Sequence, residues 1–341
     1  MKFGVFDHLD RGSRDAHAFY EGRLQLAELY DREGFSCYHL AEHHSTPIGL
    51  APAPSVFLSA VAQRTKRLRF APLVYLLPFY HPLRLIEEIC MIDQMSGGRY
   101  EIGVGRGISP VEARFYGVNA REAAERYAEV LAIVTTGLRE PELSFHGTYY
   151  HFDKVPLELA PFQRPFPPFW YGVHAAESAQ RAARAGFHVV TNEGPEKSAP
   201  VAAAFRAERQ AMREMGIVRH IVVGESDAQA YALAKPAYAK WVDNFYYLHR
   251  RYGLTSQHGK ALDLDGALVE GTAIVGSAAT VIARLEEQFA TVGFTYLLGQ
   301  FAFGDLAVAE AARSIERFAR LVMPAVRELG FAESDHSSVV R

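Results

Sequence analysis

Short apolar runs alternate with amphipathic stretches along most of this 341-residue chain. Helical patterns separate the apolar runs, such as residues 18–34, which end at Gly34, a residue type favoured just after a helix. Eight runs have the length and composition of strands, at residues 2–6, 35–44, 68–78, 99–107, 169–173, 187–192, 219–225 and 294–301. Eight strand–helix units predict an α/β fold, and a (β/α)8 TIM barrel rather than an open doubly wound sheet.

Two segments depart from this alternation. Residues 138–168 are rich in proline and aromatic residues and have little helical pattern, which predicts an inserted hairpin and loop after strand four. Residues 253–276 hold five glycines between two helical stretches, which predicts a mobile loop before strand eight. We therefore expect a single domain over residues 1–330 and a flexible tail over residues 331–341.

Composition narrows the classes of partner. The chain is 49% hydrophobic and 22% charged, which is ordinary for a globular protein with a large core. Its formal net charge of −3, with histidine neutral, gives no electrostatic case for nucleic acid or an acidic membrane. The two cysteines, Cys37 and Cys90, lie in apolar settings, and no apolar run suits a signal peptide or a membrane span. We expect a cytoplasmic protein without a disulfide framework.

The triplet Glu42, His43 and His44 closes the second predicted strand, at the edge where a barrel carries its chemistry. Adjacent strand residues point to opposite faces, so the two histidines cannot easily hold one ion while the strand persists. A metal site is therefore the weakest interpretation. A general base and a hydrogen-bonded structural histidine both fit these residues taken alone.

Other strand ends and helices carry weaker signals. The glycines of residues 103–107 would let a flat ligand approach, and Arg106 could meet a phosphate or simply be exposed on a tight turn. Residues 172–186 run from a strand into a helix whose first N–H groups suit a phosphate, although Glu177 opposes an anion there. An ordinary capped helix is the alternative at that position. The aromatic residues of the long helix near residue 240, including Trp241, are most simply packing residues.

Several segments together resemble the bacterial luciferase-like family of flavin-dependent monooxygenases, specifically its luciferase alpha-subunit branch. In chain order they are KFGVF, GFSCYHLAEHHSTPIGL, LLPFYHPLRLIEEICMIDQMSGGRYEIGVGRG, RFYGV, IVGSAATVIARL and LVMPAVRELG, and they span residues 2 to about 330. The long block over residues 76–107 is highly specific, whereas its glycine-rich end alone is not. The family's fold is a (β/α)8 barrel with an insertion, which agrees with the strand count.

The resemblance implies an activity. Reduced FMN, supplied by a separate flavin reductase, reacts in the barrel mouth with dioxygen to form a flavin peroxide. That species oxygenates a small, largely apolar organic substrate, which is an aldehyde in the luciferases. Such chemistry requires a closed apolar cavity, because water and stray protons destroy the peroxide. The family commonly pairs barrels, so a homodimer is expected.

The resemblance also implies roles for individual residues. His43 matches a general base that stabilises the peroxide, and His44 and Glu42 match its support, with Glu42 either holding that ring or paired elsewhere. Matches to the flavin-binding positions are Leu73, Val74, Arg106, Ala175 and Ser178. The first two match a pair joined by an unusual peptide bond beneath the flavin ring, and the other three match positions around the phosphate. Residues 253–276 match the family's mobile lid.

Some positions depart from the luciferases. Gly105 replaces their reactive cysteine, and Phe301 replaces an acidic residue, whereas the acidic residue after the glycine block is kept as Glu112. These changes argue against light emission and a long-chain aldehyde more than against flavin use. Three alternatives stay open: a deazaflavin-dependent oxidoreductase on the same barrel, a non-catalytic flavin-binding protein, and a metal-dependent barrel hydrolase.

Overall fold

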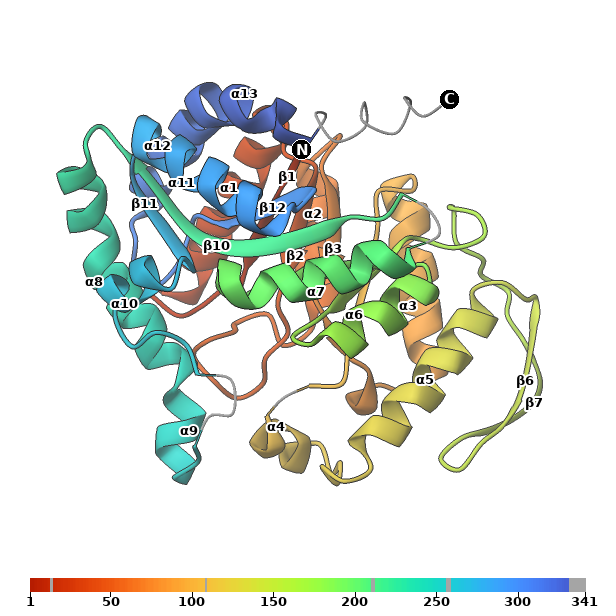
Figure 1. Ribbon diagram of the computed structural model, residues 1–341. Coiled ribbons are helices and arrows are strands. Elements are labelled where there is room, and N and C mark those ends of the chain that lie inside the picture. The colour runs from red at the N-terminus through yellow and green to blue at the C-terminus, as the bar shows by residue number, and fades with distance from the viewer. Residues whose placement is uncertain (13–14, 108, 210–211, 256–258, 331–341) are drawn as a thin grey trace, which may run out of the picture.

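Parallel strands arranged as a barrel form the centre of the molecule (Figure 1). The computed structural model describes residues 1–12, 15–107, 109–209, 212–255 and 259–330. The strands of the barrel are β1 (Lys2–Asp7), β2 (Cys37–Leu40), β3 (Arg69–Pro72) with β4 (Tyr75–Leu76), β5 (Ile102–Gly105), β8 (Phe169–Gly172), β9 (His188–Thr191), β10 (Met215–Gly224) and β12 (Tyr296–Gln300). Their order is β3-β2-β1-β12-β10-β9-β8-β5-β4. Counting β3 and β4 as one broken strand, the described residues contain the eight predicted barrel positions, and the predicted α/β barrel is confirmed.

The third barrel strand is broken, which corrects the prediction of one strand over residues 68–78. β3 pairs with β2 and β4 pairs with β5, and the Leu73–Val74 peptide between them is cis. A short 3-10 turn, η1 (Leu77–Phe79), follows β4. Strand β5 approaches the break closely, because a Cβ at Gly103 would lie 2.1 Å from the carbonyl oxygen of Pro72. Glycine at that position therefore allows the two halves of strand three to close the barrel.

Helices surround the strands. They are α1 (Ala16–Arg32), α2 (Pro54–Arg64), α3 (Pro82–Ser96), α4 (Pro110–Phe115), α5 (Ala123–Gly137), α6 (Ala176–Arg184), α7 (Pro195–Glu208), α8 (Asp227–Phe245), α9 (Tyr247–Tyr252), α10 (Leu264–Val269), α11 (Ala278–Val292), α12 (Val308–Arg317), η2 (Phe318–Val322), α13 (Met323–Val326) and η3 (Arg327–Gly330). Local sequence sets their ends, as in α1, where the Asp15 carboxylate accepts the N–H of Ala18 and Gly34 follows with φ of 81°. No helix in the described ranges is both long enough and apolar enough to cross a membrane.

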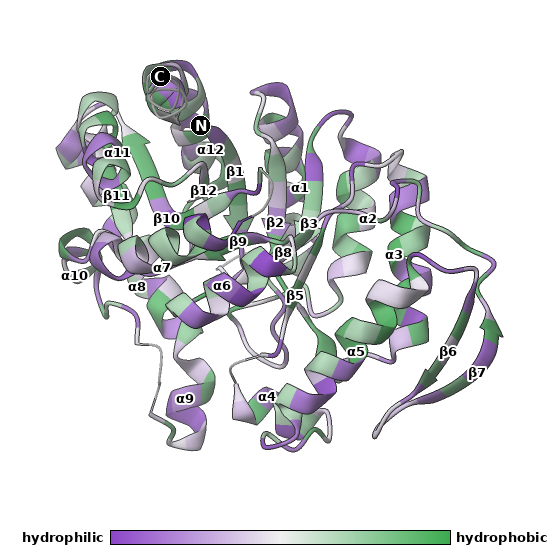
Figure 2. Ribbon diagram, turned by 45° about the vertical axis from the view of Figure 1, so that its right-hand side comes forward, coloured by the Kyte–Doolittle hydropathy of each residue, from purple (hydrophilic) through white to green (hydrophobic). Residues whose placement is uncertain are grey.

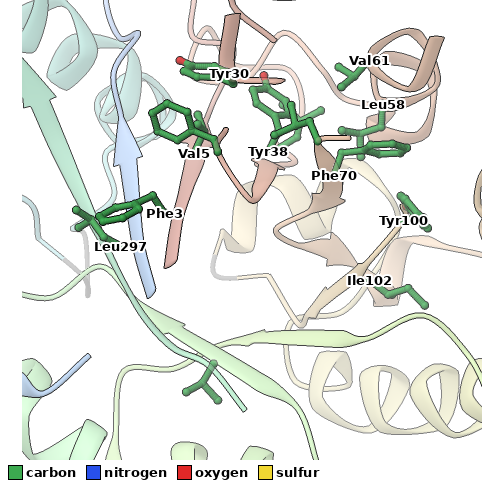
Figure 3. Packing of buried hydrophobic residues seen from close by; sticks show 14 of the residues in the cluster. Phe3, Val5, Tyr30, Tyr38, Leu58, Val61, Phe70, Tyr100, Ile102 and Leu297 are labelled. Atoms are coloured by element: carbon green, nitrogen blue, oxygen red, sulfur yellow. The ribbon is translucent and has the colours of Figure 1, made fainter. Parts of the chain in front are cut away.

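The apolar core has two parts on the two faces of the strands. Along β12, Leu297 packs outward and Leu298 packs into the barrel interior, as the two-residue period of a strand requires. Figure 3 shows the outer part, where Phe3, Tyr38 and Phe70 lie among the side chains between strands and helices. In Figure 2 the strands are mostly green and hydrophobic, whereas the outer helices carry purple hydrophilic positions. Because both faces of the strands are apolar, we expect functional polar side chains at the strand ends.

The two irregular segments differ in outcome. The insertion forms an antiparallel hairpin of β6 (Glu142–His146) and β7 (His151–Pro156), as predicted, and it projects from the barrel in Figure 1. The segment 253–276 was predicted as a loop, but its described part contains α10 and the start of β11 (Ala273–Ser277), which pairs with β10. The prediction is wrong there because β11 gains its partner through tertiary pairing that local glycine content does not reveal. Residues 256–258 and the predicted tail 331–341 lie outside the described residues.

Candidate active site

The predicted site residues lie at the carboxyl ends of consecutive barrel strands. The registers Leu40↔Pro72, Leu76↔Gly105 and Val104↔Tyr171 align β2, β3 with β4, β5 and β8 side by side. Each of these strands is followed directly by predicted residues: Glu42, His43 and His44 after β2, Leu73 and Val74 at the break, Arg106 after β5, and Ala175 and Ser178 after β8. The structure thus places all of them around one mouth of the barrel, where barrel enzymes carry their chemistry.

His43 faces a buried carboxylate. Its Nδ1 lies 3.4 Å from Oε1 of Glu112, and the His43 side chain is 21% exposed while that of Glu112 is 4% exposed. The same Oε1 accepts the backbone N–H of His44 at 2.8 Å. Burial acts to raise the pKa of Glu112, but the His43 ring and the His44 N–H outweigh it and hold that pKa below its usual range. Glu112 is therefore ionised at neutral pH and orients His43 through Nδ1.

His44 and Glu42 form a separate pair behind the mouth. Nε2 of His44 lies 2.7 Å from Oε1 of Glu42, whose other oxygen accepts the Tyr80 hydroxyl at 2.7 Å and the Leu76 N–H at 3.2 Å. Burial raises the pKa of Glu42 against these hydrogen bonds. The hydroxyl of Tyr116 lies 2.7 Å from Nδ1 of His44. Of the two possibilities that the sequence left for Glu42, the structure has the second: it is turned away from His43 and paired elsewhere.

The two adjacent histidines face different carboxylates. His43 is oriented by Glu112 and His44 by Glu42, so their rings do not converge. No group of three or more His, Cys, Asp or Glu side chains within the described ranges could hold a metal ion. The two histidines are therefore held by different partners.

The barrel interior below the mouth is apolar. Leu73 is 7% exposed and belongs to the interior cluster with Ala71 and Trp170. A Cβ at Gly105 would lie 2.4 Å from Cγ2 of Val74, so this glycine lets Val74 lie flat against β5. The luciferase cysteine position is therefore filled by the neighbouring Val74 side chain rather than by a thiol.

An exposed arginine and a helix start lie at the next strand ends. Arg106 is exposed, and its guanidinium has no hydrogen bond or ion pair with any residue of the described chain. One strand further on, the Ser178 hydroxyl donates to the Ala175 carbonyl at 2.7 Å and accepts the Ala175 N–H at 3.4 Å, which fixes the start of α6. The first N–H groups of a helix have no partner within it and attract anions. Arg106 and this turn are the positively polarised part of the mouth.

Sequence reasoning missed several polar residues of the mouth. His8 follows β1, stacks on His43 at 5.6 Å between ring centroids, and lies 3.1 Å from Nε2 of Gln300 through its Nδ1. Burial lowers the pKa of His8 well below its ordinary value, so the ring is neutral. Lys260 donates from Nζ to the carbonyl of Asn192 at 3.2 Å, and burial lowers its pKa. The position of His8 one residue beyond a barrel strand was the available signal; Lys260 had none, because it comes from the segment read as a loop.

Phe301 does not belong to the mouth. Its ring is fully buried and packs on Phe318 at 5.0 Å and Phe35 at 5.6 Å between centroids. An acidic side chain would be costly among these rings, because a buried charge needs a partner. This departure from the luciferases is therefore a feature of the outer core and leaves the mouth unchanged.

A hollow of about 610 Å³ lies outside the barrel between α2 and α3. Its inner wall includes Glu42 and His44, and its rim carries the apolar side chains Val56, Met91 and Met95, which are 73%, 50% and 54% exposed. Monomeric proteins seldom leave such groups together on the surface. Of the predicted site residues the hollow is lined by Glu42 and His44 alone, and not by His43, Arg106 or the residues that follow β8.

Comparison with known proteins identifies the family. The sequence profile of the luciferase-like monooxygenases matches residues 1–296. The chain belongs to the luciferase-like monooxygenase family. This confirms the resemblance inferred from the sequence.

Two relatives are similar in sequence to this luciferase-like monooxygenase. The uncharacterized protein y4wF of Sinorhizobium fredii (strain NBRC 101917 / NGR234) is 42% identical over 313 residues, covering 90% of this chain and 92% of y4wF. The oxygenase component of the flavin-dependent trigonelline monooxygenase of Acinetobacter baylyi (strain ATCC 33305 / BD413 / ADP1) is 27% identical over 246 residues, covering 69% and 68%. Flavin-dependent oxygenation thus occurs among its relatives.

Solved structures agree with the fold. Monooxygenase RslO1 from Streptomyces bottropensis superposes with a TM-score of 0.86 at 26% identity, covering 95% of this chain and 99% of that one. The oxygenating constituent of 3,6-diketocamphane monooxygenase from Pseudomonas putida, solved with FMN, has a TM-score of 0.81 at 22% identity, covering 95% and 98%. The coenzyme F420-dependent tetrahydromethanopterin reductase of Methanopyrus kandleri has a TM-score of 0.70 at 17% identity, covering 95% and 98%. The last two likenesses concern the fold alone.

Proposed function

We propose that this protein is the oxygenase of a two-component FMN-dependent monooxygenase. Reduced FMN comes from a separate flavin reductase, and one atom of dioxygen is transferred to a small, largely apolar organic substrate, for which an aldehyde is one option. The observation that carries the proposal is the His43–Glu112 pair, which sets an oriented imidazole beside an apolar floor and an unpartnered arginine. The trigonelline relative, named as an oxygenase component, supports the separate reductase.

The residues of the mouth fit FMN. Leu73 and Val74 offer an apolar floor for a flat ring, and Gly105 leaves it free of a further side chain. The guanidinium of Arg106 lacks a partner in the described chain, and α6, which begins after Ala175, presents the backbone N–H groups of its first turn, including that of Ser178. A flat ring system that ends in an anion would match both the apolar floor and the anion-attracting groups. We therefore assign the phosphate of FMN to Arg106, Ala175 and Ser178.

His43 is the proposed general base. Bound reduced FMN supplies the electrons that activate dioxygen. The Glu112 carboxylate favours the tautomer of His43 with its proton on Nδ1, which leaves the lone pair of Nε2 to accept a proton at the mouth and return it. Glu42 and His44 act as positioning residues: their pair fixes the backbone after β2, and the His44 N–H holds Glu112 in place.

Further parts of the proposal concern the assembly. We assign residues 1–330 to one domain. A homodimer is supported by the exposed apolar side chains Val56, Met91 and Met95 around the hollow between α2 and α3. We also propose a cytoplasmic location, because a flavin reductase and NADH would be present there.

The cofactor is tested by binding. An anaerobic equilibrium titration with reduced FMN and, separately, with reduced deazaflavin coenzyme F420 should give at least about tenfold tighter binding of FMN. One unpartnered arginine and one helix start suit the single terminal phosphate of FMN, whereas F420 carries further carboxylates beyond its phosphodiester. Tighter binding of F420 would replace the proposal by the deazaflavin-dependent oxidoreductase. A protein that binds FMN but yields no oxygenated product would be the non-catalytic flavin-binding alternative.

A further inference from the structure

Two unpartnered polar groups lie together on one wall of the barrel. Nε1 of Trp241 and Nε2 of His220 are buried and have no hydrogen-bond partner within the described chain. The rings lie 4.4 Å apart between centroids, and their residues are 2% and 7% exposed. Buried polar groups nearly always have partners, so such a pair calls for an explanation. A bound molecule that supplies the missing acceptor is the simplest one.

This wall adjoins the proposed base. The ring of His8 lies 5.6 Å from that of His43 and 5.9 Å from that of Trp241, between centroids. His220 belongs to β10, and Trp241 to α8, which follows β10, whereas Arg106 and Ala175 follow β5 and β8. In the barrel order, β9 separates β8 from β10, so this wall and the proposed phosphate position occupy different sectors. The pair is therefore placed for the substrate rather than for the phosphate.

The wall is close to electrically neutral. Burial lowers the pKa of His220 to about 3, so its ring carries no charge at neutral pH. Lys260 is the nearby cation, and it is opposed by Glu193, whose hydrogen bond with His174 lowers its pKa to about 2 and keeps it ionised. An indole nitrogen can only donate, whereas a neutral imidazole can donate or accept. An uncharged acceptor meets these conditions better than an anion does.

We propose that Trp241 Nε1 and His220 Nε2 form the polar end of the substrate site and bind an uncharged acceptor oxygen, such as a carbonyl, of the organic substrate. The inference rests on the proposed function for the identity of that substrate. The remaining wall is aromatic, with Tyr238 and Phe303 at 5.1 and 4.9 Å from the His220 ring between centroids. These two residues hold the apolar part of the same molecule. Trp241 and His220 thus determine specificity for oxygen-bearing substrates.

The chain contains only two tryptophans, which makes a direct test possible. The indole N–H of Trp170 donates to Oε2 of Glu101, whereas that of Trp241 has no acceptor in the described chain. The protein labelled with ¹⁵N-tryptophan is titrated with cyclohexanone, without flavin, and the two indole N–H signals are followed by NMR. We expect the Trp241 proton signal, assigned with Trp241→Phe, to move downfield, and the Trp170 signal to stay.

Control probes and a second variant make the result decisive. Methylcyclohexane matches cyclohexanone in size but has no acceptor, so it should leave the Trp241 proton without the downfield shift. Cyclohexanecarboxylate should bind at least about fivefold more weakly than cyclohexanone. His220→Phe should weaken cyclohexanone binding severalfold, as expected for one lost hydrogen bond. Equal shifts with cyclohexanone and methylcyclohexane, no shift with cyclohexanone, or tighter binding of the carboxylate would each overturn the inference.

The test is independent of oxygenation. It needs neither FMN nor dioxygen, so a failure of the monooxygenase proposal would leave the downfield shift in place. Conversely, an oxygenating enzyme without the shift would retain the proposed function and lose this subsite. The two outcomes are therefore distinguishable.

Discussion

Oε1 of Glu112 lies 3.4 Å from Nδ1 of His43 and also accepts the backbone N–H of His44 at 2.8 Å. One buried carboxylate therefore fixes both the ring of the proposed base and the chain that carries it. His44 itself turns to Glu42, so the adjacent histidines have different tasks. The arrangement resembles a base held by an orienting acid, which is a common way to select one imidazole tautomer.

Replacing Glu112 by Gln should lower kcat about 10- to 100-fold, less than loss of the base itself, because the ring remains but its tautomer is no longer selected. The affinity for reduced FMN should stay unchanged, since the Glu112 carboxylate contacts His43 and His44 and none of the proposed phosphate residues. Steady-state kinetics and an anaerobic titration measure kcat and the affinity for reduced FMN.

Glu112→Asp keeps a carboxylate and should retain more activity than Glu112→Gln. The exposed Glu140→Gln is the matched control. Equal losses in kcat and FMN affinity would indicate a merely structural role.

Arg106→Ala should weaken FMN binding about 10- to 100-fold, the range for loss of a charge-assisted hydrogen bond. Riboflavin has the same ring system without the phosphate, so its affinity should be the same for the variant and the wild type. The exposed Arg121→Ala serves as the matched control. Comparable weakening of riboflavin and FMN would exclude a phosphate contact.

Gly105→Ala should destabilise the protein by about 1–3 kcal/mol, because the added Cβ would lie 2.4 Å from Cγ2 of Val74. Combining it with Val74→Ala should recover part of that loss, since the colliding methyl group is removed. Gly172→Ala is the control: nothing lies within 4 Å of a Cβ there, so its effect should stay within about 0.5 kcal/mol. Urea denaturation measures all four proteins. A stable Gly105→Ala protein would contradict the close packing of β5 against the strand break.

Buried neutral histidines should make the fold sensitive to acid. Burial lowers the pKa of His39 to about 4 and that of His220 to about 3. Because the folded pKa lies below the unfolded value of about 6.5, their contribution is present above pH 6.5 and is lost as pH falls toward 3. Between pH 7 and pH 5 each should cost about 2 kcal/mol of unfolding free energy. His220→Phe should remove its share of this dependence; an unchanged slope in urea denaturation at the two pH values would show that His220 takes no part in it.

The sequence was sufficient to predict the barrel, because strand and helix periods are local properties. It also located the mouth, since parallel strands in a barrel end at the same edge. The local strand pattern did not reveal the break between β3 and β4, where Gly103 and Gly105 of another strand approach closely. The family resemblance did imply an unusual peptide bond at Leu73–Val74, and the structure has a cis bond there. β11 was missed for a similar reason: its pairing with β10 is a tertiary contact.

The partners of the site residues were harder to predict than their positions. Glu42 stands next to His43 in the chain, yet it pairs with His44, and the partner of His43 is Glu112 from α4. Side-chain direction after a strand end depends on the surrounding packing, which a single sequence does not specify. The unpartnered nitrogens of Trp241 and His220 were likewise hidden, because both residues look like ordinary core positions.

The most direct measurement follows the fate of dioxygen. The protein is combined with a flavin reductase, NADH, FMN and ¹⁸O₂, and a panel of small aldehydes and ketones is screened by mass spectrometry. We predict a product that contains one ¹⁸O atom, with its yield reduced on the order of 10²- to 10⁴-fold in His43→Ala. Oxidation of FMN at its free-solution rate, with no ¹⁸O in any product, would contradict the proposed monooxygenase activity.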